Sequence, residues 1–153
     1  MAKQKNPKKA GVQKAEPIVL SINICDIIIR DEKTKKVSLI GLFSNINAYA
    51  FPVQHPLMHV YIALTNGHGK YKINIQFVRV ADNNIIVEME GEIDFPDPLG
   101  VVEMNLEWRG IQFEKPGTYS VEVLCEGSPI GSRKFNVRQL QKQIPPTKGT
   151  EGT

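Results

Sequence analysis

Acidic and apolar side chains alternate in the segment EMEGEIDF, which places four carboxylates on one side of an extended chain: Glu88, Glu90, Glu92 and Asp94. Residues two apart in a strand lie roughly 6.5–7 Å from each other, a spacing that overlaps the separation of the paired carboxyl groups in glycosidases. Such a pair needs one acid with a raised pKa. The preceding segment carries Lys70 and Lys72 in the same alternation, and lysines beside the acids would hold them ionised. We therefore interpret the row as the solvent side of a strand and assign no catalytic residue.

Histidine and cysteine commonly bind transition metals, but their spacing here is unfavourable for a metal site. His55 and His59 are four residues apart and would lie about 13 Å from each other in an extended chain, while His68 falls in the next turn. Cys25 and Cys125 form no CxxC motif. We predict no metal site and no cofactor. Free thiols are expected in a reducing cytoplasm, and the alternative of a disulfide between the two cysteines stays open.

The N-terminal segment is rich in lysine. Residues 1–16 carry five lysines and one glutamate, a net charge of +4, whereas residues 17–140 carry 12 basic and 14 acidic residues, a net charge of −2. A segment of this composition is expected to be disordered, and its lysines would attract nucleic acid or an anionic surface in a salt-dependent way. The candidate contacts with such a partner are Lys3, Lys5, Lys8, Lys9 and Lys14. The competing interpretation is a solubilising terminus without a partner.

The whole chain has the composition of a soluble globular protein, with 41% hydrophobic and 23% charged residues. Its 153 residues suffice for one hydrophobic core. No run approaches the roughly 20 apolar residues of a transmembrane helix. The first apolar run is interrupted by Ser21, Asn23 and Asp26, which is unlike a signal peptide. We predict a cytoplasmic protein without a membrane partner.

The dominant pattern is an alternation of apolar and polar residues with a period of two, which is typical of half-buried strands. It recurs in segments separated by turn residues: 18–29, 37–51, 57–64, 70–80, 85–95, 101–113, 118–125 and 132–140. No segment shows a sustained helical period. The pattern predicts an all-β fold, an antiparallel immunoglobulin-like sandwich of seven to eight strands. The sandwich would span residues 17–140, between a lysine-rich tail (1–16) and a flexible C-terminal tail (141–153).

The segments 70–80 and 85–95 are predicted to form one hairpin around the turn ADNN. In an antiparallel pair of this parity, the polar sides of the two strands oppose each other. Lysines on the first strand and acids on the second then become cross-strand neighbours, each pair contributing roughly 0.2–1 kcal/mol. The charge change along this segment is thereby explained without a ligand.

Four residues near the end of the domain are assigned structural roles. In FEKPGTYSVEV, Gly117 precedes Tyr119 by two residues after a polar turn, a pattern that resembles the tyrosine corner of immunoglobulin-like sandwiches. Trp108 has inward parity and is predicted to lie in the core. The apolar parity slips beside Gly110, which predicts a β-bulge there. The cysteine–tryptophan–cysteine order of antibody domains is not reproduced.

Three stretches together resemble a bacterial family that is catalogued only as a domain of unknown function. They are ICDIIIRDEKTKKVSLIGLFSNINAYAFP, HVYIALTNGHGKYKINIQFVRVADNNIIVE and LEWRGIQFEKPGTYSVEVLCEGSPIGSRKFNV. They extend over roughly residues 24–137. The resemblance implies an all-β sandwich of bacterial origin and transfers no functional residue.

The sequence therefore favours a non-enzymatic β-sandwich that acts as a protein-interaction or structural accessory module. Its expected surfaces are the edge strands and the loops 52–56, 65–69 and 96–100. The partner is expected to be another protein, and the oligomeric state stays open. Two alternatives are association of the N-terminal lysines with nucleic acid or an anionic surface, and a carbohydrate-binding module. The latter requires a groove with exposed aromatic side chains near the acidic row.

Overall fold

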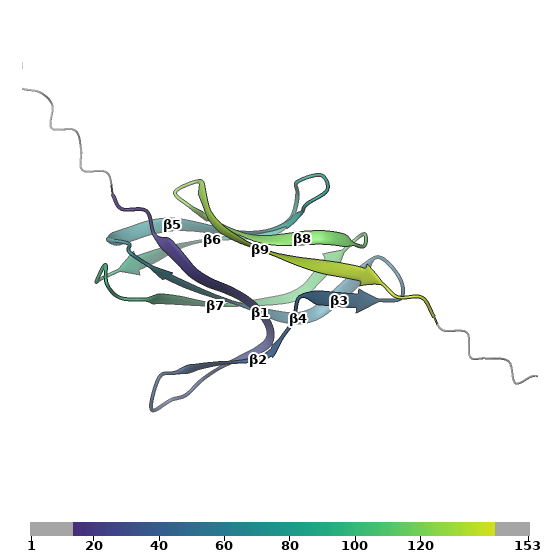
Figure 1. Cartoon of the computed structure of the whole chain (residues 1–153), viewed down its shortest axis with the longest axis horizontal. Helices are drawn as coiled ribbons and strands as arrows, with labels where there is room; N and C mark the ends of the chain where they lie inside the picture. Colours follow the sequence, from purple (N-terminus) through teal and green to yellow (C-terminus); the bar gives the residue numbers. More distant parts are fainter. Residues whose placement is uncertain (1–13, 143–153) are drawn as a thin grey trace, which may run out of the picture.

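The structure, a computed structural model, describes residues 14–142, so most of the two predicted tails lies outside the described residues. This part of the chain forms nine strands, which follow the alternating pattern (Figure 1). They are β1 (Ile18–Arg30), β2 (Val37–Leu42), β3 (Asn45–Ala48), β4 (Val53–Thr65), β5 (Gly69–Arg79), β6 (Asn84–Phe95), β7 (Val102–Phe113), β8 (Gly117–Cys125) and β9 (Ser128–Gln139). Within residues 14–142 no helix could cross a membrane.

The strands form two sheets that face each other across one core. The first sheet has the order β2-β1-β4-β7 and the second the order β3-β9-β8-β5-β6. Neighbouring strands are antiparallel except β3 and β9, which are parallel. The prediction of an all-β, immunoglobulin-like sandwich is confirmed. Among the described residues the number of strands is nine, where seven to eight were expected.

The additional strand comes from residues 37–51, which were predicted as one strand-rich stretch. The chain forms β2 in the first sheet and then crosses at Phe43 and Ser44 to form β3 in the second. The backbone N–H of Phe43 donates to Ile24 O at 3.1 Å in one sheet, and Ser44 O accepts from Asn136 N at 2.9 Å in the other. One segment therefore contributes to both layers and closes one margin of the sandwich.

Aromatic side chains from four strands, β5, β7, β8 and β9, form the centre of the core. Phe77, Phe113, Tyr119 and Phe135 contact one another with ring centroids 4.9–6.0 Å apart, and Trp108 packs edge-on against Phe77 at 4.9 Å. Trp108 thus lies on the inner face, where the alternation placed it. Truncating a buried ring of this kind to alanine typically costs about 3–5 kcal/mol.

The predicted hairpin of lysine-bearing and acidic strands is confirmed. β5 and β6 pair so that Lys70 is opposite Asp94 and Lys72 opposite Glu92. The turn between them contains Asn83 with a φ of +54°, a conformation that asparagine tolerates better than most residues. The charges on this face are therefore explained by strand pairing.

The predicted β-bulge at Gly110 is wrong, because β4 and β7 keep one register over their whole length. The buried side of β7 does change between Trp108 and Ile111, and Gly110 has a φ of +66°. However, β4 changes its buried side at the same level, around Pro56. Since both strands change together, neither gains a residue relative to the other. The segment 52–56, expected as a loop, lies almost wholly in β4, which begins at Val53.

Candidate interaction surface

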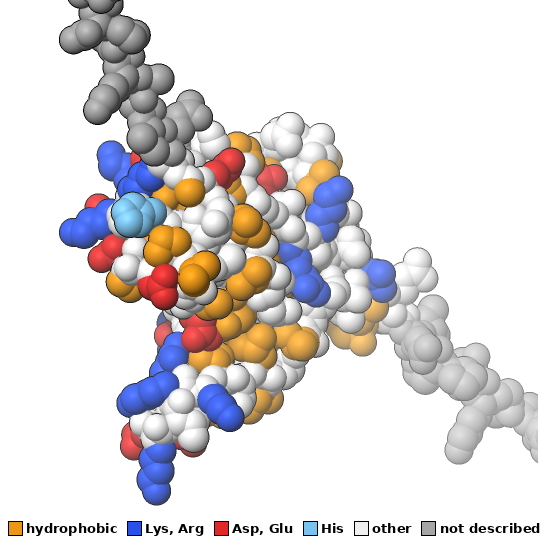
Figure 2. Space-filling model, turned by 60° about the vertical axis from the view of Figure 1, so that its left-hand side comes forward, with side chains coloured by type: hydrophobic (Ala, Val, Ile, Leu, Met, Phe, Trp, Pro, Cys, Tyr) orange, Lys and Arg blue, Asp and Glu red, His pale blue; other side chains and the backbone are white. Residues whose placement is uncertain are grey.

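The β1–β2 hairpin exposes a group of large apolar side chains, which we call the hairpin patch: Ile27, Ile29, Ile40 and Leu42. Their exposed fractions are 46%, 48%, 47% and 60%. Ile27 and Ile40 are directly opposite each other in the β1–β2 register. Contiguous exposed apolar surface of this kind is typical of interaction sites. In Figure 2 hydrophobic side chains gather on the face above the lysine-bearing projection at the lower left.

The hairpin projects because β1 leaves its neighbour in the sheet halfway along. β1 pairs with β4 only as far as Cys25 opposite His59, and beyond that point it pairs with β2 alone. At the point of departure Gly41 has a φ of +72°, and a Cβ there would lie 2.3 Å from Asp26 Oδ2. The His59 ring nitrogen Nδ1 lies 2.7 Å from Asp26 O. As a result, the end of the β1–β2 hairpin projects from the rest of the first sheet in Figure 1.

A polar cluster ties the hairpin to the outer face of the first sheet. The Arg30 guanidinium lies 4.0 Å from a Glu103 carboxylate oxygen on β7, and the other oxygen accepts a 2.6 Å hydrogen bond from the Tyr61 hydroxyl on β4. Burial, together with this bond and the negative charge of Glu103, raises the pKa of Tyr61 to about 12. The phenol therefore stays neutral and keeps donating.

The turn that ends the hairpin is ordered and basic. Asp31 Oδ1 accepts hydrogen bonds from the backbone N–H groups of Lys33 and Thr34, at 2.9 and 2.7 Å, and these bonds lower the pKa of Asp31. Residues 30–36 carry four basic and two acidic side chains, a net charge of +2. A positively charged turn thus lies directly before β2.

β2 differs from the other edge strands. In the described residues the sheets end in β2, β7, β3 and β6. Edge strands usually carry charges, prolines or bulges, or are very short, which prevents pairing with other chains. β6 and β7 carry several charged residues each, and β3 has only four residues. β2, VSLIGL, has six residues with neither charge nor proline.

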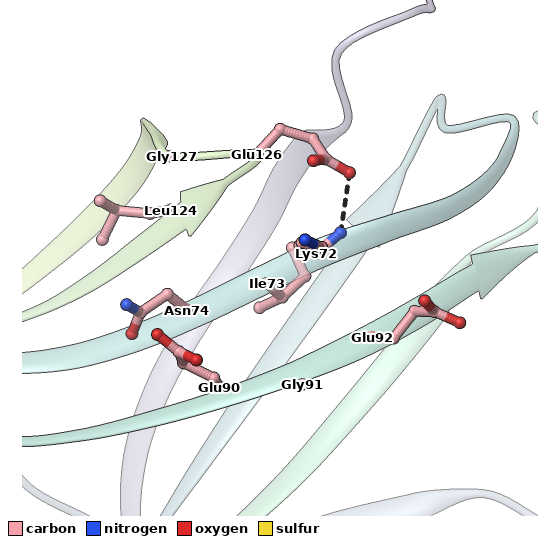
Figure 3. A pocket seen from close by; sticks show the side chains of 9 residues that line it. All are labelled: Lys72, Ile73, Asn74, Glu90, Gly91, Glu92, Leu124, Glu126 and Gly127. Carbon is pink, nitrogen blue, oxygen red and sulfur yellow. Dashed lines mark hydrogen bonds between the residues drawn. The ribbon is translucent and has the colours of Figure 1, made fainter.

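A second surface lies on the outer face of the other sheet, where a shallow groove runs between β5, β6 and β8 (Figure 3). Its polar lining includes Lys72, Glu90, Glu92 and Glu126. The Glu126 carboxylate accepts a 2.9 Å hydrogen bond from the Lys72 backbone N–H, which Figure 3 marks. None of the residues that line this groove is aromatic. The groove therefore lacks the stacking platform that the carbohydrate-binding hypothesis requires.

The histidines and cysteines do not gather in one cluster, although Cys25 lies opposite His59 in the pairing of β1 and β4. His55 packs beside Phe43 with ring centroids 5.7 Å apart, and burial lowers its pKa. Cys25 is in the first sheet and Cys125 in the second, and both are free, buried thiols whose pKa is raised by burial. Cys25 and Cys125 therefore form no disulfide with each other. Residues 14–142 contain no group of three histidine, cysteine or acidic side chains that could hold a metal ion.

Of the residues assigned structural roles, Gly117 and Tyr119 lie at the start of β8, whereas the acidic groove lies at the other end of that strand. Tyr119 is completely buried, and its hydroxyl donates to Lys115 O at 2.6 Å, which is the bond of a tyrosine corner. Gly117 starts β8 with a φ of +152°. The carbonyl of Gly110 accepts from Gln54 Nε2 at 3.3 Å. The Gln54–Gly110 bond thus links β4 to β7, and the Tyr119–Lys115 bond closes the turn before β8.

Lys14, one of the five lysines proposed to contact an anionic partner, packs on the domain. Its Nζ lies 3.8 Å from the centre of the Tyr71 ring, a cation–π contact, and donates to Lys70 O. The Tyr71 hydroxyl donates to Ala15 O at 2.5 Å. The other four lysines, Lys3, Lys5, Lys8 and Lys9, lie outside the described residues. Residues 14 and 15 are thus anchored beside β5.

Sequence reasoning did not identify the hairpin patch. The alternating pattern predicts half-buried strands and assigns no exposed apolar surface to the run Ile27–Ile29. The available signal is that this run is apolar at three consecutive positions, so at least one isoleucine must point away from any single core. The segment SLIGL that pairs with it is equally apolar.

Comparison with known proteins gives a family and a fold. A family described as "Family of unknown function (DUF6941)" matches residues 20–138. No curated protein matches the chain.

Pseudomonas fluorescens alkylpurine DNA glycosylase AlkC, bound to DNA containing an abasic site analog, is similar with a TM-score of 0.50 and 12% identity. That match covers 82% of this chain but 31% of the glycosylase, so the chain spans about a third of that protein. An immunoglobulin-like protein from Pseudomonas aeruginosa matches with a TM-score of 0.40 and 12% identity, covering 82% and 99% of the two chains. At 12% identity, the similarity to the glycosylase concerns the fold alone.

Proposed function

We propose that this chain, which belongs to the DUF6941 family of unknown function, is a non-enzymatic protein-interaction module that docks through the hairpin patch. The observation that carries the proposal is the cross-strand pair Ile27 and Ile40, both about half exposed on a hairpin that projects from the sandwich. Covering apolar surface contributes about 25 cal/mol per Å² removed from water. A partner that covers the hairpin patch gains this free energy without any rearrangement of the core.

The backbone of β2 adds a second attractive element. β2 has a neighbour on one side only, so half of its N–H and C=O groups face away from β1. An extended partner segment could pair with them, as in β-strand addition. Backbone pairing would supply affinity, and the isoleucines would supply selectivity for apolar side chains.

Site-specific photo-crosslinking tests this surface. A photoreactive amino acid replaces Ile40 on β2 in one variant and Ile85 on β6 in the control, because the two isoleucines have nearly equal exposed fractions of 47% and 45%. In native cell extract we expect discrete protein adducts from position 40 and not from position 85. No adduct from position 40, or the same adducts from both positions, would contradict the proposal.

Association with nucleic acid through the N-terminal lysines is the second candidate. The charge separation supports it, since residues 1–16 carry +4 and residues 17–140 carry −2. Deleting residues 1–13 leaves the contacts of Lys14 and Ala15 with Tyr71 in place. We expect the deletion to abolish salt-sensitive retention of DNA or RNA. Retention that survives the deletion would reject this candidate.

We also propose a cytoplasmic location and a bacterial origin. The cytoplasmic location is supported by two cysteines that are both free and buried, as expected in a reducing compartment. The bacterial origin is supported by the resemblance of residues 24–137 to a bacterial family of unknown function. Fractionation of the native cells tests the location.

A further inference from the structure

We infer that the occupant of the hairpin patch is a second copy of this chain, with the β2 strands of the two copies pairing antiparallel about a two-fold axis beside Ile40. This inference rests on the proposed function, because it names the partner of the same surface. It predicts a symmetric dimer in which the first sheets of two copies join into one continuous sheet.

The side chains of the hairpin patch are self-complementary under this symmetry. A two-fold axis perpendicular to the sheet keeps each side chain on its own face, so the Ile40 side chains of the two copies become neighbours. Ile27 is directly opposite Ile40 within each copy. The pairing therefore produces a row of four isoleucines across the dimer, Ile27–Ile40 followed by Ile40–Ile27. Aligned β-branched side chains pack well across strands.

Charge favours the same arrangement. In an antiparallel β2 pair the two basic turns lie at opposite ends of the joint, so they do not repel each other. The turn of each copy, with Lys35 and Lys36, then reaches the far end of β2 in the other copy. A hollow there is lined by Asp26, Gly41 and Asn45, and the Asp26 carboxylate lies directly over Gly41. The lysines of one copy thus meet the carboxylate of the other.

The composition of the edge is what points to a copy of the same chain. An edge without charge or proline is liable to pair with any β2 strand that it meets, and other copies of this chain carry that same strand. β6 and β7, one edge of each sheet, carry charges that oppose such pairing, so β2 and β7, the two edges of the first sheet, differ in their protection against it. A closed two-fold pair covers the β2 edge of both copies. Of the other edges in the described residues, β6 and β7 are charged and β3 has only four residues.

Sedimentation equilibrium of the full chain tests the dimer. We expect wild type to be in a concentration-dependent monomer–dimer equilibrium. Ile40→Lys should raise the dissociation constant by about 100-fold or more, because it places one unpaired ammonium group per copy in the joint. The matched control is Ile85→Lys on β6, which makes the same chemical change at an equally exposed position and should leave the equilibrium unchanged. Circular dichroism checks that both variants are folded.

Disulfide trapping gives a second, geometric readout. Directly opposite residues in an antiparallel pair have Cα atoms about 4.5–5.5 Å apart, which a disulfide can span. Ile40→Cys should therefore form a covalent dimer under mild oxidation, whereas Ile85→Cys should remain monomeric. The native thiols are buried and do not compete.

The outcomes separate this inference from the proposed function. A wild type that is monomeric at all concentrations, or a dimer that Ile40→Lys does not weaken, overturns self-pairing. If photo-crosslinks from position 40 then identify a different protein, the hairpin patch remains a docking surface and only its occupant changes. If position 40 crosslinks neither a second copy nor another protein, both proposals fail.

Discussion

The Tyr119 hydroxyl donates a 2.6 Å hydrogen bond to the carbonyl oxygen of Lys115, four residues earlier, across the turn that joins β7 to β8. The Tyr119 ring is completely buried, stacked on Phe135 and edge-on to Phe113. The ring and the hydroxyl therefore make different contributions: the ring fills the core, and the hydroxyl fixes the turn that passes from one sheet to the other.

Tyr119→Phe should lower the free energy of unfolding by about 1–2 kcal/mol, because it removes one buried hydrogen bond and keeps the ring. Urea denaturation measures the change. Tyr49→Phe is the control, since the Tyr49 side chain is 58% exposed, and it should change stability by less than about 0.5 kcal/mol. An equally small effect of Tyr119→Phe would show that the turn is held by other contacts.

Gly67→Ala should destabilise the domain by about 1–3 kcal/mol, as overpacking of a core does. A Cβ at Gly67 would lie 2.3 Å from Cδ2 of Phe95, whose ring is buried and packs edge-on against Tyr71. The ring cannot yield without moving its neighbour. The measurement is the unfolding midpoint in urea.

Gly91→Ala on β6 is the matched control for this substitution, because no atom lies within 4 Å of the position of its Cβ. It should be neutral or stabilising by up to about 1 kcal/mol, since glycine inside a strand costs backbone entropy. Equal destabilisation by the two substitutions would contradict the packing argument.

The alternation of residue types sufficed to predict the sheets, because a half-buried strand must place apolar side chains at every second position. Parity sufficed to predict that lysines of one strand and acids of the next face the same side, whereas the specific pairing of Lys72 with Glu92 comes from the register in the structure. The crossing at Phe43 and Ser44 was not predictable in this way. Neither residue is a glycine or proline, and the crossing depends on which strands offer free edges, a property of the assembled fold.

The hairpin patch was missed for a related reason. Periodicity identifies a buried face only when each strand has one, and Ile27 to Ile29 are apolar on both faces. At Gly110, periodicity read on a single strand predicted a β-bulge that the β4–β7 register does not contain. The slip of parity on β7 was visible in the sequence, but the compensating change around Pro56 on β4 could be matched to it only once the register was known.

The thiols of Cys25 and Cys125 should not react with a thiol reagent while the protein is folded. Both side chains are buried, and burial raises the pKa of each, so little reactive thiolate forms. After unfolding in urea two thiols per chain should react. The variant Ile40→Cys supplies an exposed thiol that should react at once. Rapid labelling of wild type, or fewer than two thiols after unfolding without reductant, would contradict the free and buried state of these cysteines.

The hydrogen bond between Tyr61 and Glu103 should delay the ionisation of the Tyr61 phenol at alkaline pH. Burial, then the hydrogen bond to Glu103 and its charge, raise the pKa of Tyr61 to about 12, above the ordinary value of about 10 in an unfolded chain. The difference in tyrosinate absorbance between wild type and Tyr61→Phe isolates this titration. Its midpoint should lie near 12 in wild type and fall toward the ordinary value in Glu103→Gln. Glu107→Gln, which changes the next outward acid on β7, should leave it unmoved.

The raised pKa of Tyr61 also determines how the stability of the folded protein changes with pH. The folded state holds the Tyr61 proton more tightly than the unfolded state, so the Tyr61 contribution is fully present below pH of about 10 and is lost as pH rises toward about 12. In that window the stability of wild type should fall more steeply than that of Tyr61→Phe, as measured by urea denaturation at a series of pH values. Parallel curves for the two proteins would mean that the phenol titrates alike in both states, and that Glu103 does not hold its proton.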